Sequence, residues 1–331
     1  MAKWKKRKPE TEEEPKVLSS YTLKLDEGQL EALEKICDKR LYAFYDVAHS
    51  RFAFKAPYEG INIVAYKSGK VVIQGKGTQA FVQNILEPEV TKSPQLGYEE
   101  FHNPEYYEPH AGLDEAGKGD VFGPLVSCCV IADGDMVRKW REEGVKDSKA
   151  ITDGSILRLE KIILKTKGVV VKKTFAGMAR YNELMSKPNA NLNKLLAWYH
   201  ARSLAAALQE RQVEWGLVDQ FSKAPLTQQQ LKKDGIDFDL RMRTKAEDDP
   251  VVAAASICAR AEFVRQMGKL SKDFGEPLRK GASAAVREQG KELVSKLGAH
   301  RLKDFAKVHF KTAYEILGLP VPEKPKWTPR R

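Results

Sequence analysis

The sequence predicts an α/β protein in which a mixed sheet with flanking helices follows a small α+β domain. Three observations support this fold class. The length of 331 residues suits two domains. The first part of the chain reads as a strand, a helix, three strands and a helix, which is the order of a small α+β unit. The second part opens with strands and continues with alternating helices and strands, which indicates a mixed sheet with helices on its faces.

Changes in composition set the expected domain boundaries. Charged, proline-containing segments predict disorder at the ends of the chain, and loss of any clear period predicts a linker between the domains. The predicted parts are a disordered charged tail (1–20), the small domain (21–94), a linker (95–109), the large domain (110–320) and a basic, proline-rich tail (321–331).

The small domain begins with residues 21–25 ("YTLKL"), which alternate between polar and apolar residues as a half-buried strand does. Asp26 can cap a helix, because apolar side chains recur at helical spacing from Leu30 to Cys37. Turn residues then separate three predicted strands and a closing helix, at 42–57, 61–69, 70–77 and 78–88.

The large domain begins at His110 with a short strand that ends in Asp114 and Glu115. Asp249 followed by Pro250 is a good helix start, because an N-cap precedes a proline in the first turn. The other predicted elements are strands at 124–132, 168–176, 215–219 and 238–244, a helix at 191–211, and helical segments within 282–318.

The net charge of +11 at pH 7 suits a polyanionic partner, because neutralising phosphates releases condensed counterions, although solubility alone explains the same charge. No apolar run approaches the roughly 20 residues of a membrane span, and the first residues lack the apolar segment of a secretory signal. We therefore expect a cytoplasmic protein without a membrane partner. The four cysteines lack C-x-x-C spacing, which disfavours a structural zinc site.

The stretch "GLDEAGKGD" (112–120) is one residue away from a phosphate-binding loop, since Gly119 stands where Ser or Thr should follow the lysine. Such a loop must run from a strand into a helix, whereas here a β-branched apolar run predicts another strand. Asp114 and Glu115 would also place two negative charges inside the anion site. A P-loop NTPase is therefore disfavoured.

Acidic residues at predicted strand ends favour a different chemistry. Asp114 and Glu115 end one strand, Asp219 ends another, and Glu247 and Asp248 stand just before a helix. Hydrolysis of a phosphodiester can use two divalent ions about 4 Å apart, and Mg²⁺ prefers oxygen ligands. A single acidic residue at a strand end often only caps a helix or stands in a turn. The evidence for a metal site is therefore that three such positions occur in one basic domain.

Five ordered blocks resemble those of bacterial ribonuclease HIII, a type 2 ribonuclease H. The blocks are "GLDEAGKGDVFGPLV" (112–126), "VKDSK" (145–149), "VDQF" (218–221), "RTKAED" (243–248) with "VAAASICAR" (252–260), and "AKVHFKT" (306–312). The segment "AYKSGKVVIQGKG" (65–77) looks like the TATA-binding-protein-like domain that marks the HIII branch. The resemblance covers about residues 21–318 and implies a ribonuclease-H-like mixed sheet. Ribonuclease HII usually has Arg where Lys118 stands and Pro where Asp120 stands.

The resemblance implies that four acids are the catalytic residues and hold two Mg²⁺ or Mn²⁺ ions. These acids are Asp114, Glu115, Asp219 and Glu247, and Asp114 would bridge both ions. Glu247 is preferred to its neighbour Asp248 because the family reads Lys-Ala-Glu at this place.

The resemblance also implies the substrate contacts. Gly117, Lys118 and Gly119 would form a backbone surface for the ribose, whose 2′-hydroxyl distinguishes RNA from DNA. Strand alternation sends adjacent carboxylates to opposite faces, so we expect the chain to bend after Asp114, which Gly117 would allow. Further expected substrate or active-site contacts are Lys146, Ser148 and Lys149.

Other basic positions give weaker signals. Lys303, Lys307 and Lys311 recur at four-residue spacing, which predicts one helix face that is either solvated or in contact with a duplex backbone. His309 is expected to be structural or to contact a phosphate. The predicted strands also carry an aromatic residue among polar and basic ones, namely Tyr66, Lys67, Lys70, Gln74 and Lys76. This suits a shallow duplex groove, although tyrosine on a small sheet is more often core.

The implied activity is that of an endonuclease that cuts the RNA strand of RNA–DNA hybrids and leaves 3′-hydroxyl and 5′-phosphate ends. We expect a monomer whose partner is the hybrid duplex. The nearest alternative is incision at single ribonucleotides in DNA, as in ribonuclease HII, which the extra domain and Lys118 disfavour. A non-catalytic nucleic-acid-binding protein is the alternative from another class, and the presence of all four acids disfavours it.

Overall fold

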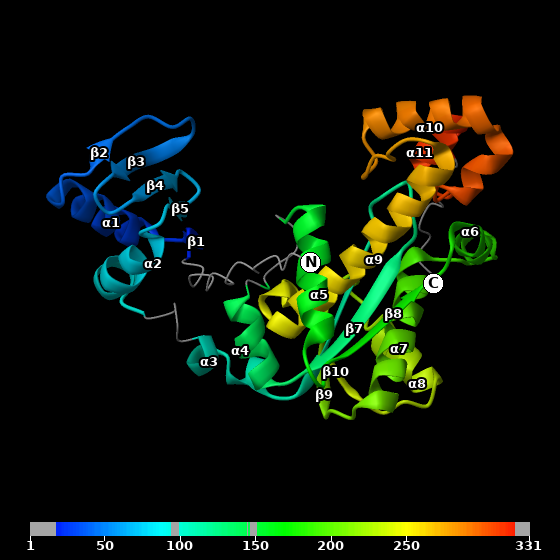
Figure 1. The fold of residues 1–331 in the computed structure, drawn as a ribbon, viewed down its shortest axis with the longest axis horizontal. Coiled ribbons are helices and arrows are strands. Elements are labelled where there is room, and N and C mark those ends of the chain that lie inside the picture. Colours follow the sequence, from blue (N-terminus) through cyan, green and yellow to red (C-terminus); the bar gives the residue numbers. More distant parts are fainter. Residues whose placement is uncertain (1–17, 94–98, 144, 146–150, 322–331) are drawn as a thin grey trace, which may run out of the picture. The chain divides into compact units, whose positions relative to one another are not determined.

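A computed structural model of the 331-residue chain describes residues 18–93, 99–143, 145 and 151–321. The chain divides into two compact units, Met1–Pro104 and Glu105–Arg331 (Figure 1). Nearly all of the two predicted tails lies outside the described residues, so the predicted domain boundaries stay a prediction.

The first unit is built on an antiparallel sheet with the strand order β1-β5-β4-β3-β2. Its elements are β1 (Ser20–Lys24), α1 (Glu27–Lys39), β2 (Ala43–Phe44), β3 (Ser50–Ala56), β4 (Ile61–Tyr66), β5 (Lys70–Gln74), α2 (Thr78–Phe81) and the π-helical segment η1 (Val82–Thr91). Asp26 caps α1 as predicted, since its carboxylate accepts a hydrogen bond from Gln29 N at 2.9 Å. The single strand predicted over 42–57 is wrong, because the chain turns at His49, whose φ is 62°.

One face of this first sheet is buried under helices. Leu33 and Cys37 of α1 share a core cluster with Val71 and Ile73 of β5. Side chains alternate along a strand, so the intervening residues point to the other face. In β5 these are Lys70, Val72 and Gln74, which are exposed or partly exposed.

The second unit contains a mixed sheet with the order β10-β9-β6-β7-β8, which confirms the predicted fold class. Strands β6, β9 and β10 run parallel, whereas β7 and β8 join by antiparallel pairing. Its strands are β6 (His110–Ala116), β7 (Val126–Ala132), β8 (Val170–Phe175), β9 (Trp215–Asp219) and β10 (Asp239–Arg243). Helix α3 (Glu99–His102) lies at the end of the first unit, and η2 (Pro104–Tyr107) spans the boundary. The helices of the second unit are α4 (Gly134–Glu142), α5 (Asp153–Lys165), α6 (Met178–Ser186), α7 (Leu192–Glu210), α8 (Leu226–Lys233), η4 (Ala246–Asp248), α9 (Pro250–Phe274), α10 (Ala284–Leu297), η5 (Ala299–Asp304) and α11 (Lys311–Leu317).

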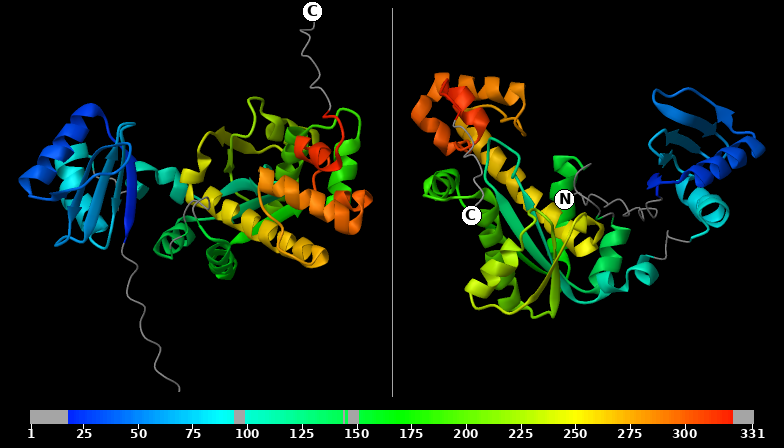
Figure 2. Two further views of the ribbon diagram at one scale, coloured as in Figure 1. Left: turned by 90° about the horizontal axis from the view of Figure 1, so that it is seen from above. Right: turned by 180° about the vertical axis from the view of Figure 1, so that it is seen from behind.

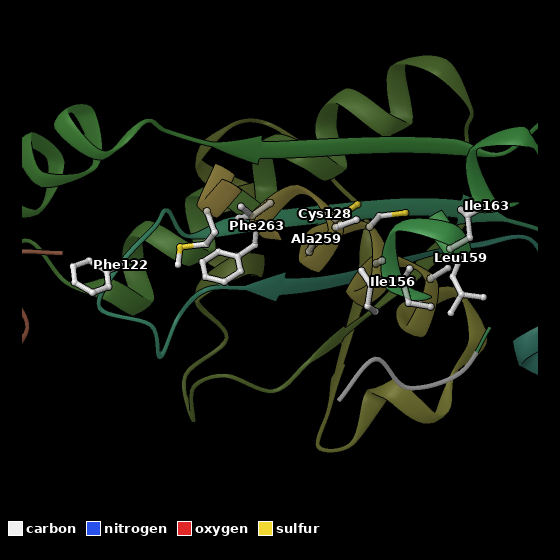
Figure 3. Packing of buried hydrophobic residues seen from close by; sticks show 14 of the residues in the cluster. Phe122, Cys128, Ile156, Leu159, Ile163, Ala259 and Phe263 are labelled. Atoms are coloured by element: carbon white, nitrogen blue, oxygen red, sulfur yellow. The ribbon is translucent and has the colours of Figure 1, made fainter. Parts of the chain in front are cut away.

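Helices cover both faces of the second sheet. The long helix α9 contacts β6 and β7, while α7 packs on β7 and β8 (Figure 2). On the α9 side, Cys128 lies in one core with Ile156, Ala259 and Phe263 (Figure 3). The neighbouring Cys129 belongs to the separate core under α7. The two faces of β7 therefore supply two different cores.

A glycine sets the distance between β6 and α9. A Cβ atom on Gly112 would lie 2.4 Å from Val251 C and from Val252 N. Only glycine lets the strand approach the start of α9 so closely, and α9 carries part of the cavity wall described below. No helix in the described part of the chain is long and apolar enough to cross a membrane.

Candidate active site

The four predicted acids line one cavity at the carboxyl ends of the parallel strands. Asp114 and Asp219 come directly after Leu113 and Val218, the last residues that pair β6 with β9. Glu247 lies in η4, just after β10. Neighbouring parallel strands end at the same edge of a sheet, which is where open α/β sheets bind ligands. The cavity has a volume of about 420 Å³ and is lined by Asp114, Glu115, Ala116, Gly117, Lys118, Asp120, Asp219, Glu247, Ser256, Arg260, Phe263 and Lys280.

The predicted bend after Asp114 is wrong. The ladder between β6 and β7 continues in register to Ala116, with Asp114 opposite Cys128 and Glu115 opposite Ser127. The two carboxylates therefore do lie on opposite faces. Both reach the cavity because the pairing of β6 with β9 stops at Leu113, so that the cavity extends around the free edge of the strand.

Asp114 is partly buried on the α9 side of the sheet. Its Oδ1 accepts a hydrogen bond from Glu115 N at 2.7 Å. Burial and the nearby charge of Glu115 raise the pKa of Asp114, against the opposing effect of hydrogen bonds from Ser256 and the backbone. In the described part of the chain no basic side chain forms an ion pair with this carboxylate. A nearby cation would therefore favour its ionised form.

Glu115 is held on the α7 side by two basic groups. Its Oε2 accepts a hydrogen bond from His200 Nε2, and its Oε1 from Lys118 Nζ, each at 3.2 Å. Burial acts to raise the pKa of Glu115, but the hydrogen bond and charge of His200 and the charge of Lys118 outweigh it and lower that pKa. His200 was not predicted as a functional residue.

Consecutive acids at 247–249 have different environments. Glu247 lines the cavity, whereas Asp248 is exposed and does not line it. Asp249 is buried, caps α9 through Val251 N at 2.7 Å, and contacts the ring of His110. This placement favours Glu247 over Asp248 as the fourth carboxylate of the site.

Asp219 is tied to the same turn. Its Oδ1 accepts a hydrogen bond from Ala246 N at 3.1 Å, and Lys245 takes a left-handed conformation with φ 58°. This contact joins the end of β9 to the segment that carries Glu247, so the two carboxylates are positioned together.

The predicted substrate loop has one constrained and one open glycine. Gly117 has φ +83°, and a Cβ atom there would lie 2.2 Å from Pro124 O. A Cβ atom on Gly119 would meet nothing within 4 Å. Lys118 contacts Glu115 and lies over the ring of Phe221, with Nζ 5.2 Å from its centroid. The predicted contacts Lys146, Ser148 and Lys149 lie outside the described residues.

A basic side of the cavity was missed. Lys280 Nζ contacts Asp153 Oδ1 at 2.6 Å, and Arg260 Nη2 donates to Ile151 O at 2.9 Å. Gly281 N donates to Asp120 Oδ1 at 2.6 Å, which fixes the Lys280 segment against the substrate loop. The four-residue spacing of Ser256 and Arg260 was the available signal, since it places both on one face of α9.

The predicted basic helix face is also wrong. Lys303 lies in η5, Lys311 begins α11, and Lys307 is fully buried between them. Lys307 Nζ donates hydrogen bonds to Asp120 O, at 2.8 Å, and to Gly123 O. Burial lowers its pKa to about 7. Lys307 thus holds the segment 120–123, which follows the predicted substrate loop, instead of contacting solvent or a duplex.

The donor set fits hard divalent cations. Four carboxylates around one cavity supply the oxygen ligands that Mg²⁺ and Mn²⁺ prefer. Among the described residues, no three His, Cys, Asp or Glu side chains already stand close enough to form a ligand cluster. In this arrangement Glu115 and Asp219 each accept a hydrogen bond from a protein donor. Cation binding at Glu115 would require Lys118 to move away from Oε1.

Comparisons with known proteins give the family of this chain. The family model described as Ribonuclease HII matches residues 111–313, and a domain of unknown function (DUF3378) matches residues 23–95. Ribonuclease HIII of Protochlamydia amoebophila is 37% identical over 304 residues, covering 92% of this chain and 97% of the relative. Ribonuclease HIII of Chlamydia abortus is 36% identical and covers 84% and 91%, respectively. The solved structure of Bst-RNase HIII in complex with Mn²⁺ superimposes with a TM-score of 0.62 at 29% identity, covering 91% of this chain and 98% of that one.

Proposed function

The chain belongs to the ribonuclease HIII family and is an endoribonuclease acting on RNA–DNA hybrids, and we propose that Asp114, Glu115, Asp219 and Glu247 are its catalytic carboxylates. The observation that supports this assignment is that all four side chains line one cavity although they are far apart in the sequence. We propose Mg²⁺ or Mn²⁺ as the cofactor, with two ions per site, and a monomer as the active form.

Two divalent ions, when bound, would supply activation of the attacking water and stabilisation of the leaving oxygen, giving 3′-hydroxyl and 5′-phosphate ends. The residues of the chain position these ions from both sides of β6. Asp114 offers its carboxylate from the α9 side and Glu115 from the α7 side. Asp219, at the end of β9, and Glu247, in η4 just after β10, complete the site.

The rest of the cavity suits the RNA strand. The proposed contact with a ribose 2′-hydroxyl is the backbone of the loop in which Gly117 lines the cavity and Gly119 is exposed. Arg260 and Lys280 line the cavity and supply positive charge for a phosphate. Lys118 can add to this charge when a cation replaces it at Glu115.

The open face of the first sheet is the proposed second contact with the hybrid. Lys24 and Lys70 pair on neighbouring strands, and both are exposed. Lys55 Nζ lies 4.7 Å from the ring centroid of Tyr45. Basic and aromatic groups on one uncovered sheet face suit the phosphates and sugars of a shallow groove.

The test is cleavage of a labelled RNA–DNA hybrid by the wild type and by Asp114→Asn. We expect the variant to bind the hybrid with nearly unchanged affinity and to lose cleavage. Near-normal cleavage by the variant would show that Asp114 is not a catalytic carboxylate.

The match to the ribonuclease HII model keeps one alternative open for experiment. A duplex with a single ribonucleotide and a duplex with four consecutive ribonucleotides separate the two activities. We expect cleavage of the second substrate, and preferential cleavage of the first would favour an HII-type enzyme.

A further inference from the structure

A buried histidine, His200, is hydrogen-bonded to Glu115, one of the proposed catalytic carboxylates. We propose that His200 is a positioning residue that fixes Glu115 for cation binding, an inference that rests on the proposed function of the site. The ring of His200 is fully buried, and its Nε2 lies 3.2 Å from Glu115 Oε2. Since an ionised carboxylate can only accept, Nε2 carries the hydrogen in this bond.

The imidazole ring itself has little freedom. Its Nδ1 pairs with Ser127 Oγ at 2.9 Å, and Ser127 Oγ lies 3.2 Å from Ser203 Oγ. Ser203 Oγ in turn donates to His200 O at 3.0 Å. Rotating the ring would break contacts of both nitrogens inside a buried network, which costs far more than the same change in water. The ring also stacks on Phe221, with 5.5 Å between centroids.

The two oxygens of Glu115 have different partners. Oε2 faces the buried ring of His200, whereas Oε1 contacts Lys118, whose side chain is 32% exposed. A lysine on a flexible stem can move aside, but the fixed imidazole cannot. Oε1 is therefore the oxygen that Glu115 offers to a cation, and His200 keeps Oε2 on the protein side while Lys118 is displaced.

A histidine inside a helix core is more often only a packed, hydrogen-bonded side chain, so the experiment must separate the two roles. Two conservative variants do this because each keeps a polar group at the position of only one of the two ring nitrogens. In His200→Gln the amide nitrogen can take the place of Nε2 and still donate to Glu115. In His200→Asn the shorter amide can reach Ser127 but not Glu115.

We expect His200→Asn to lose about 10- to 100-fold in Mn²⁺ affinity or kcat, the usual effect of removing a group that orients a metal ligand. His200→Gln should recover most of this loss, while hybrid KM stays close to that of the wild type for both. Mn²⁺ affinity is measured without substrate, from the EPR signal of free Mn²⁺, and the folded state of each variant is checked by thermal unfolding. Equal losses in the two variants, or no loss in either, would overturn the proposal.

A double-mutant cycle keeps the test valid if His200→Asn also loosens the fold. In the Glu115→Ala background the same change should leave Mn²⁺ affinity unaltered, because His200 acts only through Glu115. An undiminished effect in that background would show a general structural role and overturn the proposal. Failure of the proposed function is a separate result, since Asp114→Asn would then retain near-normal cleavage of the hybrid whatever His200 does.

Discussion

Gly117→Ala tests how tightly the predicted substrate loop (117–119) is fixed at the end of β6. The new Cβ atom would lie 2.2 Å from Pro124 O and 2.8 Å from Phe263 Cδ2. Restoring an ordinary contact with the carbonyl oxygen requires a shift of about 1 Å. The positive φ of +83° adds strain of about 1–2 kcal/mol for a residue with a side chain. With the packing strain included, we expect about 2–4 kcal/mol of lost stability.

The effect on catalysis should be larger than the effect on the fold. Asp114 and Glu115 lie in β6, which ends one residue before Gly117, so a shift at this glycine should move the two carboxylates. A misplacement of about 1 Å in an active site can cost about 100-fold in rate. We expect kcat to fall by roughly this factor in hybrid cleavage, with folding measured by urea denaturation.

Gly119→Ala is the matched control for stability. Its Cβ atom would meet nothing within 4 Å, so the free energy of unfolding should stay within error of the wild type. Any effect should appear in KM, because the methyl group stands where the ribose is expected to approach. The reasoning is refuted if Gly117→Ala retains both its stability and a kcat within about twofold of the wild type.

Three further predictions address separate parts of the structure. Glu247→Gln should lose at least about 100-fold in kcat for hybrid cleavage, because removing a metal ligand should cost no less than removing a residue that only orients such a ligand. Asp248→Asn should keep a kcat near that of the wild type. The reverse order would assign the fourth carboxylate to Asp248. Lys307 has its pKa lowered from 10.5 to about 7 by burial, so the unfolded chain binds more protons between these values and the free energy of unfolding should rise with pH across this window. Urea unfolding of Lys307→Met should lack this rise, and a parallel pH dependence in both proteins would contradict the burial argument. Lys70→Ala should reduce by about one the slope of the logarithm of the hybrid-binding constant against the logarithm of salt concentration. Lys39→Ala, on the helix at the covered face, should leave this slope unchanged. Equal slopes for the two variants would exclude the open sheet face as a contact.

Asp114 and Asp219 could be found from the sequence, because the end of a strand is visible as the end of an apolar run. Asp114 and Asp219 each close an apolar run, and the parallel arrangement of their strands brings such ends to one edge. The choice of Glu247 depended on a resemblance, and the cavity lining now supports it. A helix start at Asp249 followed from local chemistry, since its carboxylate caps the first turn of its own helix.

Features that depend on packing across the fold were not visible in the sequence. Spacing alone placed Lys307 on a helix face that is either solvated or in contact with a duplex, whereas the chain buries it against the carbonyl groups of a loop far away in sequence. The expected bend at Asp114 assumed that a site needs both carboxylates on one face, but an unpaired strand edge makes both faces accessible. His200 had one weak signal, a titratable residue among the apolar residues of α7, and only the fold brings it to Glu115.

The arrangement of the four carboxylates is tested most directly by crystals of the wild type soaked with Mn²⁺ in the presence of a non-cleavable hybrid. The account predicts two anomalous peaks about 4 Å apart, bound by oxygens of Asp114, Glu115, Asp219 and Glu247. Peaks bound by other side chains, or a Glu247 carboxylate directed away from the ions, would contradict it.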